Sequence, residues 1–212
     1  MKLDKDIIII DIEGTGLNGM KYSVCELGAV RLNTDGEEVS HFHSDQYIRP
    51  LEDKFLPEAM ATHGISWKTL QKAPTFEQVI AVFEAWCKEH GDDFILASWG
   101  IIYDITFMQC QYHKTSRKWP FSYRYLDIRS LAKWETLKLG LVDDFNLMGY
   151  MDIWDIDQGD DVLHSAIGDV RMTVRLFQKL MNISTTPKDK SIHEIVRDQK
   201  CRDYYDIQGA EW

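Results

Sequence analysis

The chain has 212 residues and a formal net charge of −10, with 44% hydrophobic and 27% charged residues, which is ordinary for a globular protein. That length suffices for one well-buried domain and leaves too little chain for two. The longest purely apolar run, Ile7–Ile10, is far shorter than the roughly 18 residues that a membrane span needs. The acidic balance argues against an extended clamp on a nucleic-acid duplex, because such proteins neutralise many phosphates with basic patches.

The cysteines are scattered and form no CxxC pair, so neither a zinc site nor a disulfide framework is indicated. They are Cys25, Cys87, Cys110 and Cys201. Free thiols suit a reducing compartment, and the charged N-terminus shows no signal peptide. We therefore expect a cytoplasmic protein without a membrane partner.

The first third of the chain predicts three strands. Residues 6–12 form a β-branched run, and 23–32 and 38–48 flank the turn residues 33–36, which indicates a hairpin. Residues 50–67 are irregular, with a proline suited to a first helical turn.

The rest of the chain predicts alternating helices and strands. Thr75 is a suitable N-cap for apolar residues that recur at helical spacing as far as Trp86. Further elements are expected as a strand at 94–97, a helix at 103–113, a strand at 123–128 and helices at 141–150 and 165–181. A leading hairpin followed by this alternation predicts an α/β fold, with helices covering a mixed sheet. Polar residues 184–212 are expected to form a tail outside a domain at 1–183.

Two carboxylates stand at the end of the most hydrophobic strand. Asp11 and Glu13 are two residues apart, so the period of a strand puts both on one face while Ile12 points to the other. Neighbouring carboxylates on a buried strand repel each other unless a cation neutralises them, and such hard oxygen ligands suit Mg²⁺ or Mn²⁺. On the dipeptide alone, a strand that ends in a solvated acidic turn is the favoured interpretation.

Three further candidate site residues follow later in the chain. Asp104 lies at the start of a helix after the strand at 94–97, where sites of α/β sheets gather, although a helix-terminus acid is an equal interpretation. His164 and Asp169 cannot share a helix face at a spacing of five. With Ser165 as N-cap, His164 would lie on the approach loop and Asp169 on the first turn.

Together these motifs resemble the DEDDh branch of the DEDD 3′-to-5′ exonucleases, in the DnaQ-like superfamily, over about residues 5–183. The resemblance rests on Asp-x-Glu-x-Thr-Gly at 11–16, a central Asp104, and His-x₄-Asp at 164–169 before an amphipathic helix. The His-Gly-Ile segment at 63–65 also fits. The first motif, Cys25-Glu26-Leu27 and Trp99-Gly100 are most similar to the ERI-type exoribonucleases.

The resemblance implies an RNase H-like fold with a five-stranded mixed sheet and helices on both faces. It implies two divalent ions, Mg²⁺ or Mn²⁺, held by Asp11, Glu13, Asp104 and Asp169, and His164 as general base. Contacts to the terminal nucleotide are implied for Thr15, Leu17, His63 and Ile65. His63 is alternatively a turn residue that closes a short helix.

The expected function is release of nucleoside monophosphates from single-stranded 3′ ends, with RNA favoured by the ERI-like motifs. Alternatives are a proofreading-type exonuclease acting on DNA, a phosphohydrolase of small nucleotides, and a nucleic-acid-binding module with little turnover. The last alternative requires a missing ligand, and none is missing. His41 and His43, which alternate along a strand, are expected to face solvent or a polar edge.

Overall fold

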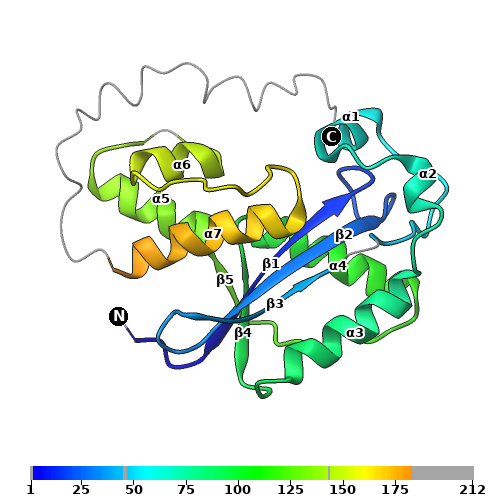
Figure 1. The fold of residues 1–212 in the computed structure, drawn as a ribbon, viewed down its shortest axis with the longest axis horizontal. Helices are drawn as coiled ribbons and strands as arrows, with labels where there is room; N and C mark the ends of the chain where they lie inside the picture. Colours follow the sequence, from blue (N-terminus) through cyan, green and yellow to red (C-terminus); the bar gives the residue numbers. More distant parts are fainter. Residues whose placement is uncertain (1, 45–46, 143, 183–212) are drawn as a thin grey trace.

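The computed structural model describes residues 2–44, 47–142 and 144–182, and it contains a five-stranded mixed sheet (Figure 1). The strand order is β3-β2-β1-β4-β5. The strands β1, β2 and β3 pair antiparallel, whereas β4 runs parallel to both β1 and β5. Their bounds are Asp6–Gly14 (β1), Val24–Leu32 (β2), Glu38–His43 (β3), Phe94–Ser98 (β4) and Tyr125–Asp127 (β5).

Helices cover both faces of the sheet, as predicted. On one face α3 and α4 pack against the strands, and on the other lies α7, with α5 and α6 beside it (Figure 1). Two short helices, α1 and α2, follow β3. The bounds are Pro57–His63 (α1), Trp67–Leu70 (α2), Phe76–Lys88 (α3), Ile101–Lys114 (α4), Ile128–Lys138 (α5), Leu147–Ile153 (α6) and Ala166–Met181 (α7).

The central strand β1 is buried from both sides, and its side chains point alternately to the two faces of the sheet. Ile8, Ile10 and Ile12 enter the core beneath α3 and α4. Ile7 and Ile9 enter the core beneath α7. By the same period of two, Asp11 and Glu13 belong to the α7 face, and Ile12 points away from them. The predicted separation of the two carboxylates from Ile12 is therefore confirmed.

The structure corrects several predicted boundaries. Helix α5 was not predicted from the sequence, because β5 has only three residues and Asp127 is both its last residue and the residue before α5. The helix predicted at 141–150 begins later, at Leu147, since the Asn146 side chain accepts a hydrogen bond from the Gly149 N–H and caps α6. The strand predicted at 38–48 ends at His43.

The predicted tail at 184–212 lies outside the described residues. In the described part of the chain, no helix combines the length and apolarity required to cross a membrane.

Candidate active site

The carboxylates of β1 reach the edge of the sheet where the parallel strands β1 and β4 both end. The pairing of β1 with β2 shifts register between Glu13 and Gly14, which ends the regular ladder there. In parallel sheets this edge is the usual place for a ligand site. The side chains of Asp11 and Glu13 therefore lie close to the residues of α4 and α7 that reach the same edge.

Asp104 reaches this edge from the first turn of α4. Its carboxylate is 4% exposed and accepts a hydrogen bond from the Ser98 hydroxyl at the end of β4. A backbone hydrogen bond from Ile12 also holds it against β1. These contacts fix Asp104 at the ends of the two parallel strands, close enough for its charge to raise the pKa of Asp11.

His164 and Asp169 reach the edge from the opposite layer. His164 precedes α7 with a φ of 62°, and its backbone N–H donates to Asp169 Oδ1 at 3.4 Å. Asp169 lies in the first turn of α7. The placement of both residues agrees with the prediction from their spacing of five.

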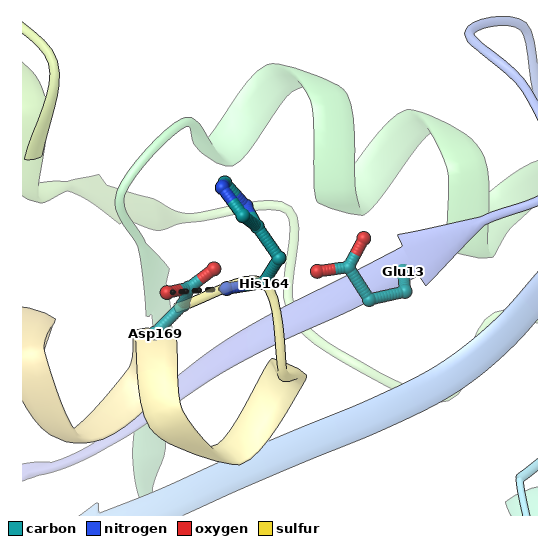
Figure 2. Close-up of side chains that lie close together, drawn as sticks. All are labelled: Glu13, His164 and Asp169. Carbon is teal, nitrogen blue, oxygen red and sulfur yellow. Dashed lines mark hydrogen bonds between the residues drawn. The ribbon is translucent and has the colours of Figure 1, made fainter. Parts of the chain in front are cut away.

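Glu13, His164 and Asp169 converge, although they come from opposite ends of the described chain (Figure 2). One donor atom from each of the three side chains lies within 4.8 Å of the other two, and all three side chains are partly buried. Figure 2 shows the Glu13 carboxylate, from β1, directed toward the loop that carries His164. Such a group of nitrogen and oxygen donors is suited to a divalent cation.

Four carboxyl groups at the site have raised pKa values, so their anionic forms are unfavourable. Burial, and then the charges of Asp104, Asp169 and Glu13, raise the pKa of Asp11 well above its usual value. Burial, and then Asp169, raises the pKa of Glu13 to about 8. Burial likewise raises the pKa of Asp104 and that of Asp169 to about 7. A bound cation would relieve both the repulsion and the loss of hydration, so the donor set fits a divalent metal.

Of the residues predicted to bind the terminal nucleotide, Leu17 is the one with substantial exposure, 53%. Thr15 is fully buried, and its N–H and side-chain oxygen bond to the backbone of Ser23. At Gly16 a Cβ would lie 2.4 Å from the Tyr22 ring, so this glycine permits a close contact within the protein. The loop is thus fixed from within, and the Leu17 side chain on it stays accessible.

His63 and Ile65 lie at the C-terminal end of α1. The Ile65 N–H donates to His63 Nδ1 at 3.0 Å, and His63 Nε2 lies 3.8 Å from the Cys25 sulfur. Ile65 is 7% exposed and packs with Cys25 and Leu70. His63 also forms a hydrogen bond with the backbone of Gly14 and interacts electrostatically with Glu26 and His164. It therefore closes the turn after α1 and lies near the carboxylates, and its contact with a nucleotide stays a prediction.

Glu26 is a fifth carboxylate at this site, and the sequence indicated it only as part of the Cys25-Glu26-Leu27 motif, without a role. Glu26 is the residue of β2 that pairs with Glu13 in the sheet, and it is 3% exposed. It contacts His43 of β3, so the expectation of a solvent-facing histidine holds for the exposed His41 and is only partly right for His43. The hairpin turn was the one signal that could have paired Glu26 with Glu13, but the turn does not fix the register alone.

The mixed five-stranded sheet with helices on both faces is the RNase H-like fold of structurally similar exonucleases. The family model described as Exonuclease (RNase_T) matches residues 8–177, and the chain belongs to this family. The prediction of a DEDDh-type 3′-to-5′ exonuclease of the DnaQ-like superfamily is confirmed. Use of divalent metal ions is typical of the family.

Among curated proteins, the chain is similar to the 3′-5′ DNA exonuclease Cap18 of Escherichia coli. The two are 24% identical over 200 residues, which cover 89% of this chain and 98% of the relative. It is also similar to the PolC-type DNA polymerase III of Latilactobacillus sakei subsp. sakei (strain 23K). These are 30% identical over 109 residues, which cover 51% of this chain and 7% of the polymerase.

Solved structures show the same fold. The nuclease domain of 3′hExo, a DEDDh family member bound to rAMP, superposes with a TM-score of 0.65 at 24% identity, covering 82% of this chain and 92% of that one. Cell-death related nuclease 4 has a TM-score of 0.72 at 18% identity, with coverage of 85% and 64%. Exonuclease I of E. coli in complex with a dT13 oligonucleotide has a TM-score of 0.69 at 14% identity, with coverage of 85% and 41%.

Proposed function

We propose that the chain removes nucleoside monophosphates, one at a time, from the 3′ ends of single-stranded RNA. The observation that carries the proposal is the convergence of Glu13, His164 and Asp169 at the sheet edge, where donor atoms lie within 4.8 Å of one another. Asp11 and Asp104 add negative charge to the same place. The domain would extend over residues 1–183.

In this proposal Asp11, Glu13, Asp104 and Asp169 hold two divalent cations, Mg²⁺ or Mn²⁺. Bound cations would supply Lewis acidity and positive charge to the phosphate. The four carboxylates would hold those cations at the sheet edge. Ser98 and the backbone of Ile12 keep Asp104 in place while it does so.

His164 would take the proton of the attacking water at its imidazole ring. Its pKa is lowered by burial, which keeps the ring neutral and able to accept a proton at neutral pH. His164 has a left-handed backbone conformation and lies on the loop ahead of the first turn of α7. The base is thus carried by the loop, and the metal ligand Asp169 by the helix.

Preference for an unpaired end follows from the exposed side chain beside the site. Leu17 offers an apolar surface on which the terminal base can pack, and the buried Thr15 fixes its loop. The net charge of −10 offers little to neutralise a long duplex, so contacts to the last few nucleotides are expected to dominate. The preference for RNA rests on the ERI-like first motif at 11–16.

DNA is the second candidate substrate, and one observation favours it. The similarity to the 3′-5′ DNA exonuclease Cap18 extends over 89% of this chain and nearly all of that protein. The sheet-edge site would act in the same way on either sugar.

The test is degradation of RNA and DNA oligonucleotides of matched sequence, each labelled at the 5′ end, in Mg²⁺ and in Mn²⁺. We expect stepwise shortening from the 3′ end, nucleoside 5′-monophosphate as product, and inhibition by a 3′-phosphate. Faster decay of RNA supports the RNA proposal, and faster decay of DNA supports the second candidate. Internal cleavage, or loss of nucleotides from the 5′ end, would contradict the proposed function.

A further inference from the structure

Glu26 connects three elements of the structure through one buried carboxylate. It stands on β2 opposite Glu13, on the face of the sheet that carries α7. Its Oε2 accepts a hydrogen bond from the N–H of Ala166, the first residue of α7, at 3.2 Å. Its Oε1 lies 2.8 Å from Nε2 of His43 on β3.

The backbone of α7 lies directly on β2 next to this carboxylate. A Cβ at Gly28, two residues further along the same face, would lie 2.6 Å from the carbonyl carbon of Ala166 and from the nitrogen of Ile167. Glycine therefore allows the helix backbone to approach β2 closely. The Glu26 carboxylate and the absence of a side chain at Gly28 together fix the position of the α7 N-terminus and its distance from β2.

The first N–H groups of a helix lack partners within the helix, and a carboxylate near them is favoured by the helix dipole. The Ser165 side chain forms no capping hydrogen bond in α7, so Glu26 supplies an acceptor from a distant strand. His164 and Asp169 flank this contact, two residues before Ala166 and three after it. A shift of the Ala166 N–H would move both.

We propose that Glu26 is a positioning residue for the exonuclease reaction. By holding the first turn of α7 against β2, it sets the positions of His164 and Asp169 relative to Glu13. The inference rests on the proposed function of that site. The hydrogen-bonding reach of the Glu26 side chain to Ala166 is the property that matters, and its charge is secondary.

Two substitutions separate the hydrogen-bonding reach of the Glu26 side chain from its charge. Glu26→Gln keeps the side-chain length and an acceptor oxygen but removes the charge. Glu26→Asp keeps the charge and shortens the side chain by one methylene. Since misplacement of catalytic groups by about 1 Å can cost about 10²-fold in rate, we expect kcat to fall roughly 10²-fold in Glu26→Asp with KM nearly unchanged. Glu26→Gln should retain a kcat within about fivefold of the original.

Amide hydrogen exchange of the metal-free protein gives a second readout that needs no activity. The Ala166 amide should exchange markedly faster in Glu26→Asp than in Glu26→Gln or the original protein. If the original protein degrades no oligonucleotide, the proposed function fails, while the exchange measurement still tests the position of α7.

Asp6→Asn is the matched control for general destabilisation. Asp6 is another acid of the same sheet, paired with Arg31 at the far end of β1. Its loss should lower the melting temperature and leave kcat unchanged. An unchanged kcat in Glu26→Asp, or a larger loss in Glu26→Gln than in Glu26→Asp, would overturn the positioning role of Glu26.

Discussion

At the scale of single residues, Asp169 shows the conflict between stability and function in this site. Its pKa is raised to about 7, chiefly by burial, so its anionic form is unfavourable in the metal-free protein. We predict that Asp169→Asn abolishes turnover, because the acids act as a unit. The melting temperature of the metal-free variant at pH 8 should rise above that of the original protein.

Calorimetry and the oligonucleotide assay together check this prediction. Asp160→Asn is the control, since Asp160 is an exposed acid on the segment before α7. It should change neither quantity appreciably. Near-normal turnover of Asp169→Asn in Mg²⁺ would contradict the assignment of Asp169 as a metal ligand.

His164 allows a prediction about pH. If His164 is the general base, as we propose, the neutral imidazole is the active form. Because burial lowers its pKa from 6.5, the rate should then rise with pH through a value below 6.5. His164→Ala should lower kcat about 10²- to 10⁴-fold and abolish that acid limb. A pH–rate series in Mg²⁺ measures both effects. An unaltered acid limb in the variant would show that another group is the base.

The sequence predicted these positions well, because local periodicity determines them. The spacing of two placed Asp11 and Glu13 on one face, and the spacing of five placed His164 before α7. The role of Glu26 was missed because it depends on the pairing of β2 with β1 and on a contact with Ala166, 140 positions away in the sequence. No local pattern encodes that contact.

At the scale of elements, the contact between β2 and α7 depends on Gly28. A methyl group there would meet backbone atoms of Ala166 and Ile167 at 2.6 Å, so α7 would have to move. We predict that Gly28→Ala destabilises the protein by about 1–3 kcal/mol. It should lower kcat by a larger factor than it changes KM. Urea unfolding and oligonucleotide kinetics measure the two effects. A variant with the original stability and rate would show that α7 tolerates displacement.

The other face of β2 carries the buried Arg31. Its guanidinium is 1% exposed and binds Asp6 together with the carbonyl oxygens of Cys87, His90 and Gly91 at the end of α3. We predict that Arg31→Met lowers the free energy of unfolding by about 3 kcal/mol, because it leaves Asp6 and these carbonyl groups without their partner. The kcat should be unchanged, since Arg31 lies at the opposite end of the sheet from Glu13. Urea unfolding at pH 7 provides the measurement.

The elements themselves were predicted unevenly. Strands and helices with a buried face and clear caps, such as α3 with its capping box at Thr75 and Gln78, were recognised. The helix α5 was not, because it starts without a loop after β5 and leaves Leu131, Trp134 and Leu137 exposed. Apolar residues on the solvent side hide the period that would have revealed it.

At the scale of the whole molecule, the raised carboxyl pKa values make stability depend on pH and metal together. Each such group stabilises the folded state fully below its unfolded pKa, near 4, and this contribution is lost as the pH rises through 7 to 8. We predict that the melting temperature of the metal-free protein falls over that range. Millimolar Mg²⁺ at pH 8 should restore it. A Mg²⁺ effect as large at pH 5 as at pH 8 would contradict this linkage.

The site joins β1, near the beginning of the chain, with α7, the last described helix. During synthesis on a ribosome, β1 leaves the exit tunnel long before α7, so Asp11 and Glu13 emerge without His164 and Asp169. On the proposed assignment of these residues, a nascent chain therefore has no activity on the nucleic acids around it until translation has passed α7. Incomplete products, and fragments that proteolysis has clipped ahead of α7, should be harmless in the same way.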